Sequence, residues 1–298
     1  MRYDRRLDKV YLKAHKIQID DTSKLVIMSD CHRGNGEHGD NFAGNEHLYF
    51  CAMEEYYKNG FTYFELGDGD ELWENRSFKS ITGRHNTVFW LLGKFFKEGR
   101  LHMIYGNHDM VKKNKKWVKN NLESYTDERT MKQLSLFPGI IPREAISLSY
   151  KRCSREIVLL HGHQVDPLNS TFWHIARFLV RYFWEPLETW GVCDPTRAAK
   201  NNHKKHRTEQ RLSYWAKKRG KLLIAGHTHR PMLPSPVEGG YFNDGSTVHP
   251  RCITCIEIEE GKICLAKWSI CTREDRTFFV CREILAEKVP LENFFENM

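Results

Sequence analysis

The chain has 298 residues, of which 40% are hydrophobic, and it carries a formal net charge of +8. This composition can bury a core and excludes a disordered or collagen-like chain, and the length favours two domains or one α/β domain with a large insertion. The positive charge is concentrated, with five lysines in 111–120 and ten lysines or arginines in 196–221. Such local charge indicates that anionic ligands or surfaces meet particular parts of the molecule.

The beginning of the chain and its cysteines bear on where the protein works. Residues 1–15 contain no continuous apolar stretch, which argues against a secretory signal. The most apolar segment, 172–184, is too short and too interrupted by His and Arg to span a bilayer. Nine cysteines are an odd number for a fully paired framework, so we expect reduced cysteines and a cytoplasmic location.

Apolar runs that predict buried strands alternate with segments of helical periodicity. Five short runs each end in polar residues, and they occupy 24–30, 61–68, 101–109, 156–163 and 221–229. Helices are predicted at 45–60 and 87–99, each closed by a glycine. No strand pattern occurs in 165–217, which we interpret as a helical lid insertion, and 251–270 predicts a hairpin turning at Glu260–Gly261. This alternation is typical of an α/β sheet covered on both faces.

All five predicted strands end in side chains that can bind metals. They are Asp30 and His32, Asp68, Asn107 to Asp109, His161 and His163, and His227 and His229. Ligands of such sheets gather beyond the carboxyl ends of the strands, so we expect these side chains to lie close together. Carboxylate and amide oxygens mixed with imidazoles, without thiolates, suit Mn, Fe, Zn or Mg. Two such ions side by side need an oxygen ligand that bridges them.

In this order the motifs resemble the signature of the calcineurin-like metallophosphoesterases, which reads D-x-H, G-D, G-N-H-[DE], H and G-H-x-H. The likeness covers about 24–230. It implies an α/β fold, the four-layer α/β/β/α sandwich of that family, formed by 1–298 as a single domain with 165–217 as the lid insertion. It also implies two divalent metal ions, with Mn²⁺ as the first candidate and Fe, Zn or Mg as alternatives.

The resemblance also assigns the metal ligands of this chain. Asp68 would bridge the two ions, and the terminal ligands would fall into two groups. These are Asp30, His32 and His229 for one ion, and Asn107, His161 and His227 for the other.

The resemblance further implies the roles of three neighbouring residues. His108 would be the catalytic acid that protonates the leaving oxygen, and Asp109 would orient it. A hydroxide shared by the two metals would attack phosphorus in line. Arg33, next to the first ligand pair, would hold a non-bridging phosphate oxygen.

Within this family the layout resembles the UDP-2,3-diacylglucosamine hydrolases of the lipid A pathway. The segments that carry the likeness are GDGDELWE at 67–74, GHTHRP at 226–231 and the lid between the last two motifs. One difference is His108, because those enzymes usually carry arginine at that place.

The predicted lid has an unusually wide apolar face. A helix beginning at Phe172 would present two adjacent apolar stripes opposite a narrow polar stripe that contains Arg177 and Arg181. Such a face suits an acyl-chain groove or a membrane surface, but the same side chains would equally serve as core between lid and body. We interpret Arg177 and Arg181 as substrate-binding residues and the basic segment 197–211 as a site for phosphates or anionic headgroups.

Several acidic and imidazole side chains near the motifs have a less specific interpretation. His163 is predicted to lie beside the site or at the surface without binding metal. Asp70 and Glu71 follow Asp68 closely and compete with it as ligands, although the turn at the strand end would redirect Asp70. Glu74 is expected to be solvated or to lie near the substrate.

Cysteines and lysines outside the motifs are expected to have no role in metal binding or catalysis. Cys252 and Cys255 would point to opposite faces of a strand, and no second pair stands at zinc spacing. Cys31 is expected to be a buried packing residue. The lysine run 111–120 predicts a solvated helix face, with nucleic-acid binding as the less favoured alternative.

We therefore predict a hydrolase of phosphoester or pyrophosphate bonds. The favoured substrate is a phosphorylated amphipathic or lipid-nucleotide compound, similar to UDP-2,3-diacylglucosamine, met at the inner membrane surface through peripheral contact of the lid. One alternative is a soluble phosphodiesterase or phosphomonoesterase acting on nucleotides, phosphoproteins or nucleic acid. Another is a metal-binding scaffold for protein interactions that has no turnover.

Overall fold

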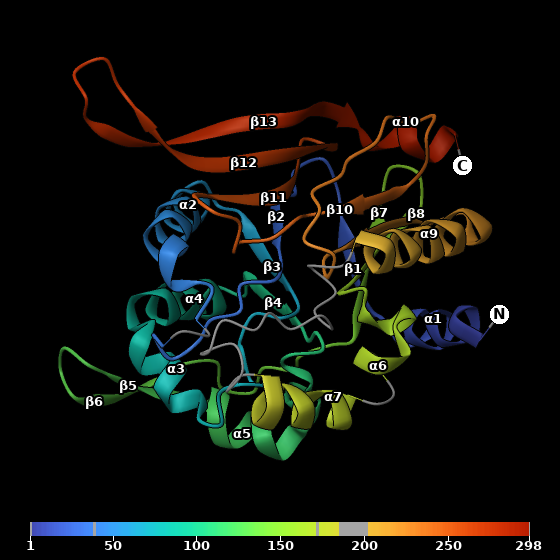
Figure 1. The fold of residues 1–298 in the computed structure, drawn as a ribbon. Coiled ribbons are helices and arrows are strands. Elements are labelled where there is room, and N and C mark those ends of the chain that lie inside the picture. Colours follow the sequence, from blue (N-terminus) through green and yellow to red (C-terminus); the bar gives the residue numbers. More distant parts are fainter. Residues whose placement is uncertain (1, 38–39, 171–172, 185–201, 298) are drawn as a thin grey trace.

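The five predicted strands form in the computed structural model, and they are divided between two sheets (Figure 1). β2 (Leu25–Met28), β3 (Thr62–Leu66) and β4 (Leu101–Ile104) lie in one sheet, whereas β8 (Arg155–Leu160) and β9 (Leu222–Ala225) lie in the other. They are buried along most of their length, as the continuous apolar runs predicted. The structure describes residues 2–37, 40–170, 173–184 and 202–297.

The larger sheet has six strands in the order β13-β12-β11-β2-β3-β4. β2, β3 and β4 pair in parallel, so their carboxyl ends meet at one edge. β11 (Cys252–Glu259) pairs antiparallel with β2 and forms the predicted hairpin with β12 (Lys262–Thr272). Glu260 and Gly261 connect them with φ of 54° and 67°, which suits a tight hairpin turn. β13 (Phe278–Pro290) was not predicted, and it forms the edge of the sheet.

The smaller sheet has five strands in the order β1-β7-β8-β9-β10. β7 (Ala145–Tyr150) and β8 form an antiparallel hairpin, and the other neighbours pair in parallel. β1 (His15–Ile19), β7 and β10 (Tyr241–Asn243) were not predicted, because polar residues interrupt their short apolar patterns. The parallel pairing of β8 with β9 brings the carboxyl ends of these two strands together.

The two sheets pack face to face around a shared hydrophobic core. Ile27 and Phe64 of the larger sheet and Leu159 and Ile224 of the smaller one belong to this core and are buried. Alternate residues of the same strands point outward, so each sheet buries its other face under helices. This arrangement is the four-layer α/β/β/α sandwich that the family resemblance implies, and the predicted fold class is confirmed.

Helices cover the outer face of each sheet. The larger sheet is covered by α2 (Glu46–Lys58), α3 (Phe78–Arg84), α4 (Asn86–Lys97) and α5 (Lys115–Leu122). The smaller sheet is covered by α1 (Arg2–Leu12) and α9 (Asn202–Arg219). α2 and α4 confirm the two predicted helices. α10 (Leu291–Glu296) packs against the core between the sheets.

The segment 165–217, predicted as a helical lid, contains helices with two different surroundings. After β8 come η3 (His163–Val165), α6 (Pro167–Ser170), α7 (Trp173–Leu179) and the π-helical turn η4 (Val180–Trp184). α9 packs Leu212 and Trp215 against the smaller sheet, so the chain from residue 202 onward covers that sheet instead of the strand ends. The rest of the predicted lid, 171–172 and 185–201, lies outside the described residues. None of the described helices is long and apolar enough to cross a membrane.

The lysine-rich stretch 111–120 lies in η2 (Met110–Lys113) and α5. Its other lysines are exposed, as a solvated helix face requires, but Lys112 is buried. Two small elements complete the description. η1 (Ala43–Asn45) precedes α2, and a hairpin of β5 (Ser124–Asp127) and β6 (Lys132–Ser135) follows α5.

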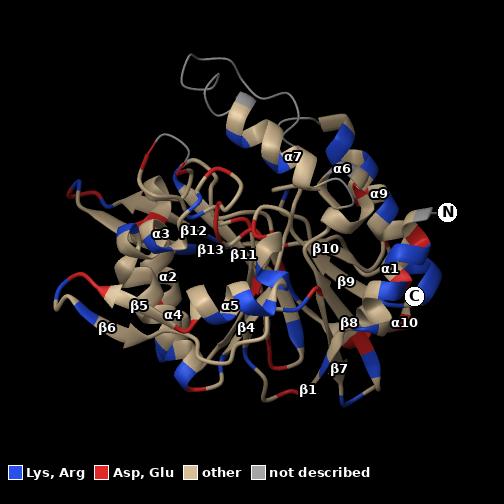
Figure 2. Ribbon diagram, turned by 90° about the horizontal axis from the view of Figure 1, so that it is seen from below, with Lys and Arg blue, Asp and Glu red and all other residues tan. Residues whose placement is uncertain are grey.

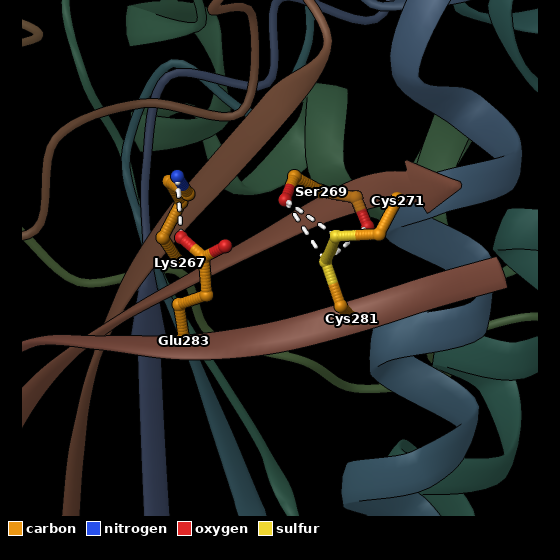
Figure 3. Close-up of a disulfide and its surroundings, with 5 residues drawn as sticks. All are labelled: Lys267, Ser269, Cys271, Cys281 and Glu283. Atoms are coloured by element: carbon orange, nitrogen blue, oxygen red, sulfur yellow. Dashed lines mark hydrogen bonds and ion pairs between the residues drawn. A yellow bond between two sulfur atoms is a disulfide. The ribbon is translucent and has the colours of Figure 1, made fainter. Parts of the chain in front are cut away.

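One pair of cysteines departs from the expectation of unpaired thiols. Cys271 of β12 and Cys281 of β13 form a disulfide between the two outer strands of the larger sheet (Figure 3). The same strands are linked beside it by an ion pair of 2.6 Å between Lys267 and Glu283. Within the described residues, six other cysteines are free. Cys252 is partly exposed and Cys255 is buried, so these two are ordinary strand residues, as predicted.

Candidate metal centre

The predicted metal ligands lie in the loops that follow the five strands, in an uncommon backbone conformation. Asp30, His32, Asp68, His227 and His229 have φ between 47° and 67°. Side chains other than glycine rarely adopt this left-handed region, and each such residue costs about 1–3 kcal/mol. Strain repeated at five ligand positions indicates that the loops are shaped for the side chains they present.

Two positions beside these ligands require glycine, because carboxylate oxygens of the ligands lie where a Cβ atom would be. A Cβ atom at Gly106 would overlap Oδ1 of Asp68, and one at Gly226 would lie 2.6 Å from Oδ2 of Asp30. No side chain fits at either place, because the carboxylate would have to move. These glycines therefore let the strand ends bring the two aspartates into the same small space.

The ligands from both sheets converge on the two aspartates. Nε2 of His229 lies 3.0 Å from Oδ1 of Asp30, and Nε2 of His161 lies 3.1 Å from Oδ2 of Asp68. Nε2 of His32 lies between the carboxylates, 3.7 Å from Asp30 and 3.9 Å from Asp68. His227 is near Asp68 and His161, close enough for one ion to contact all three. Six of the seven predicted ligands are thus brought together, from the loops that follow β2, β3, β8 and β9.

Several ligand atoms of this cluster are buried and make no hydrogen bond within the described part of the chain. They are Nε2 of His32, Oδ1 of Asn107 and Nε2 of His227. Leaving a buried polar atom without a partner costs about 1–3 kcal/mol, so such a group of atoms needs an explanation. Mixed oxygen and imidazole donors around one space fit divalent cations of the Mn, Fe or Zn type.

The other ring nitrogen or carboxylate oxygen of several ligands forms a hydrogen bond with the backbone. Nδ1 of His161 donates to the carbonyl of Leu66 at 2.9 Å. Oδ2 of Asp30 accepts the amide of His227, and Oδ1 of Asp68 accepts the amide of His108, both at 2.8 Å. Such contacts orient a metal ligand and set which ring nitrogen faces the ion.

Charge inside the cluster favours a cation. Burial alone would favour neutral carboxyls, but the neighbouring imidazoles hold the pKa of Asp30 and of Asp68 below their ordinary range. Burial likewise opposes a charged His161, yet Asp68 and Asp30 raise its pKa to about 9. Burial, with His161 nearby, lowers the pKa of His227 to about 3. The ionised carboxylates thus draw protons onto neighbouring imidazoles, and a bound cation would displace those protons.

His108 is oriented by Glu71, and the prediction that Asp109 orients it is wrong. Nδ1 of His108 lies 2.7 Å from Oε1 of Glu71, whose Oε2 lies 2.8 Å from Nδ1 of His32. The ring of Trp73 stacks on His108 with 4.3 Å between centroids. Burial opposes the charge on Glu71, but His108 and His32 lower its pKa. Glu71 thus joins the candidate acid to one metal ligand.

Arg33 and Asp109 belong to a separate group of buried charges, the ionic cluster. Its members are Arg33, Glu65, Asp70, Lys112 and Asp109. Nζ of Lys112 lies 2.7 Å from both Asp70 and Asp109, and Arg33 lies 2.7 Å from Glu65 and 2.8 Å from Asp70. Asp109 also accepts the amide of Gly106 at 2.6 Å.

The ionic cluster corrects two predictions and agrees with the expectation that Asp70 is turned away from the metal ligands. Arg33 is completely buried, so it cannot hold a substrate phosphate as predicted. Asp109 supports the backbone of the loop that carries Asn107, because its side chain turns away from His108. Asp70 is paired with two cations, so it does not compete for a metal.

The remaining predicted residues are found in different surroundings. Arg181 donates hydrogen bonds to the carbonyls of Trp73 and Leu72, so its guanidinium is engaged by the protein instead of being free for substrate. Arg177 lies on α7 with its guanidinium carbon 4.9 Å from the ring of Trp173. His163 is fully buried with its ring 5.5 Å from that of His161, beside the site as predicted.

Sequence reasoning missed the roles of three residues, although it named Glu71 as a competing ligand. Glu71 and Trp73 lie within GDGDELWE, where an acid and an aromatic residue close behind a ligand are a usable signal for contact with the site. Lys112 had no such signal, because it lies in a run of lysines and only its burial distinguishes it.

One of three comparisons with known proteins identifies the family of the chain. The sequence profile described as Calcineurin-like phosphoesterase matches residues 23–231, more than half of the chain. No curated protein matches the chain. Among solved structures, the chain is similar to Vps29 of Chaetomium thermophilum with a TM-score of 0.41 and 11% identity, over 90% of this chain and 99% of that chain.

Proposed function

The chain belongs to the calcineurin-like phosphoesterase family, and we propose that it hydrolyses phosphoester or pyrophosphate bonds with two divalent cations bound at the strand ends. The observation that carries this proposal is the convergence of imidazole and carboxylate ligand atoms, among them the buried Nε2 atoms of His32 and His227, which make no hydrogen bond within the described residues. Imidazoles beside ionised carboxylates are the donor set of a cation site, and a bound cation displaces the protons that such imidazoles carry.

The same residues divide into two sets of ligands. Asp30, His32 and His229 offer atoms close enough to share one ion, and Asp68, His161 and His227 do the same for a second. Asn107 would complete the second set, and Asp68 would bridge both. Divalent cations bound here would supply Lewis-acid charge and lower the pKa of coordinated water.

The chain itself supplies the proton donor. His108 is held through Nδ1 by Glu71, which leaves Nε2 for the leaving oxygen. Trp73 covers one face of the ring and limits its rotation. Glu71 also holds His32, so the acid and one metal ligand keep a fixed relative position.

We propose an amphipathic phosphorylated substrate of the UDP-2,3-diacylglucosamine type, met through peripheral contact with the cytoplasmic face of a membrane. Ile175 and Phe178 of α7 are 56% and 60% exposed, which is more than a core-packing helix requires. Lysines and arginines lie along α1 and α9 on one side of the molecule (Figure 2), where anionic headgroups would be attracted.

The proposed activity is tested by metal content together with hydrolysis of bis-p-nitrophenyl phosphate, p-nitrophenyl phosphate and a UDP-sugar, each with added Mn²⁺. About two ions per chain and turnover that Asp68→Ala abolishes are expected. Metal binding without turnover on any of these compounds would favour the scaffold alternative. Absence of bound metal would refute the proposal.

The substrate class is tested by sedimentation with vesicles of anionic phospholipid. Wild type is expected to sediment, and the double variant Ile175→Ser/Phe178→Ser is expected to remain in solution. Phe278→Ser is the matched control, because Phe278 is 76% exposed at the start of β13, outside α1, α7 and α9. Failure of the wild type to sediment would favour a soluble nucleotide or phosphoester substrate.

A further inference from the structure

A single arginine holds the turn that carries the contacts of His108. Nε of Arg181 donates to the carbonyl of Trp73 at 2.7 Å, and Nη2 donates to the carbonyls of Leu72 at 2.9 Å and Asn75 at 3.4 Å. The planar guanidinium suits several acceptors that lie side by side. Arg181 therefore caps the turn 72–75 in the way that a basic side chain caps the end of a helix.

The neighbouring residue contacts the other end of the same turn. The hydroxyl of Tyr182 accepts a hydrogen bond of 2.7 Å from Arg76, whose guanidinium carbon lies 5.3 Å from the Tyr182 ring. Consecutive residues of an α-helix do not face the same surface, but Arg181 and Tyr182 lie in the π-helical turn η4. Such turns are rare and frequent at functional sites. The lid helix is thus joined to the turn through two adjacent side chains.

The turn 72–75 and the residue before it contact the imidazole of His108 on two sides. Glu71, directly before it, lies 2.7 Å from Nδ1, and Trp73 within it stacks at 4.3 Å with an angle of 24° between the rings. Trp73 is 4% exposed, so its ring has little freedom to move alone. The position of His108 therefore follows the position of the turn.

We propose that Arg181 is a positioning residue for His108. The inference rests on the proposed function, since it gives His108 the role of acid at the leaving oxygen. Without Arg181 the three carbonyls would bind water, and the turn would gain freedom. Trp73 and Glu71 would then hold the ring less well, and misplacement by about 1 Å can reduce a rate by about 100-fold. This role replaces the direct contact with substrate that the sequence predicted for Arg181.

The test compares aryl phosphate esters whose leaving groups range from p-nitrophenol to phenol. A poor leaving group needs the acid, and p-nitrophenolate does not, so Arg181→Gln is expected to lower kcat for the phenyl ester about 10-fold or more. Its kcat for the p-nitrophenyl ester and its KM for both are expected to stay near wild type. His108→Ala should show the same dependence on the leaving group.

The double variant Arg181→Gln/His108→Ala gives the sharpest outcome. If Arg181 acts through His108, the double variant is no slower than His108→Ala alone. Losses that multiply, or a KM that rises for every ester, would show direct substrate binding and overturn the proposal. Lys79→Gln, which removes an exposed charge from α3, is the matched control and should resemble wild type. Trp73→Phe should keep most of the activity that Trp73→Leu loses.

Amide hydrogen exchange provides a readout that does not need turnover. Residues 71–76 are expected to exchange faster in Arg181→Gln than in wild type or Lys79→Gln, and unchanged exchange would overturn the inference. If wild type hydrolyses no ester, the proposed function fails. The exchange result then still decides whether Arg181 holds the turn.

Discussion

Two groups of buried charges lie side by side in this molecule and differ in the side chains that face their carboxylates. In the ionic cluster, Lys112 and Arg33 are each within 2.8 Å of carboxylates. In the ligand cluster, the carboxylates of Asp30 and Asp68 face imidazoles, with Nε2 of His229 at 3.0 Å and Nε2 of His161 at 3.1 Å. The residues alternate along the chain, since Arg33 follows His32 and Asp70 follows Asp68 by two positions. Burial of charge alone therefore does not identify a metal site, whereas carboxylates that face imidazoles instead of Lys or Arg indicate one.

The difference teaches what each cluster contributes. Paired charges satisfy one another and fix the loops that follow β2, β3 and β4 relative to one another. Carboxylates and imidazoles that face one another can bind a cation in exchange for the imidazole protons. The four predictions that follow separate these contributions, from the largest expected effect to the smallest.

The largest effect is expected for Asp68→Asn compared with Asp70→Asn. Asp68 faces both ligand sets, so its loss should remove bound metal and lower kcat by more than about 1,000-fold, because several kcal/mol of transition-state stabilisation depend on the ions. Asp70→Asn should keep its metal while losing stability. Metal analysis and steady-state kinetics check this, and equal metal content in the two variants would contradict it.

Lys112→Met is expected to lower the free energy of unfolding by about 3–5 kcal/mol, because it removes the cation paired with the buried carboxylate of Asp109 and leaves Asp70 paired with Arg33 alone. Urea denaturation in the presence of a chelator measures this effect without a contribution from metal. Lys112→Arg retains the charge and is the control, with a smaller loss. A change below about 1 kcal/mol for Lys112→Met would show that the ionic cluster does not stabilise the fold.

Removal of metal by a chelator is expected to lower stability by about 3 kcal/mol relative to protein with Mn²⁺ at about 100 times its Kd. Thermal unfolding with and without Mn²⁺ measures this difference. The shift should vanish in Asp68→Asn and persist in Asp70→Asn, since only the first changes a ligand. A Tm shift of equal size in both variants would mean that the ion binds elsewhere.

The smallest effect is expected for the contribution of His85 to the pH dependence of stability. This histidine lies outside the ligand cluster. His85 lies buried between Asp40 at 2.8 Å and Glu46 at 3.1 Å, and Glu46 also pairs with Arg84. Burial opposes its charge, but the two carboxylates raise its pKa above the ordinary value of 6.5, and His85 lowers theirs. A raised pKa stabilises the fold fully below pH 6.5, and this stabilisation is lost as the pH rises through the folded value.

The pH dependence of unfolding by urea, measured in chelator, checks this expectation. Stability should fall as the pH rises above 6.5, and His85→Gln should show a flatter profile over the same range. The carboxylates act in the opposite direction, since their contribution is lost only as the pH falls through their lowered pKa values. An unchanged slope in His85→Gln would show that the histidine is neutral in the fold.

Much of the fold could be predicted because its central strands are buried on both faces. Leu25–Met28 and Leu222–Ala225 are continuous apolar runs, because a strand that is buried on both faces tolerates few polar side chains. β7 and β13 could not be predicted, since a strand with Ser147 or Arg282 within it becomes a strand only through its pairing partners. The division into two sheets came from the family resemblance and not from the pattern.

The sequence by itself determined which residues form the candidate metal centre, because cation ligands need particular donor atoms and strand ends bring them to one edge. Only the tertiary structure decided how neighbouring charges are used. Arg33 and Lys112 are paired with buried carboxylates, Glu71 instead of Asp109 holds His108, and Arg181 binds carbonyls. The physical reason is that each partner comes from a different loop, and a side chain beyond a strand end points where the local backbone turns it.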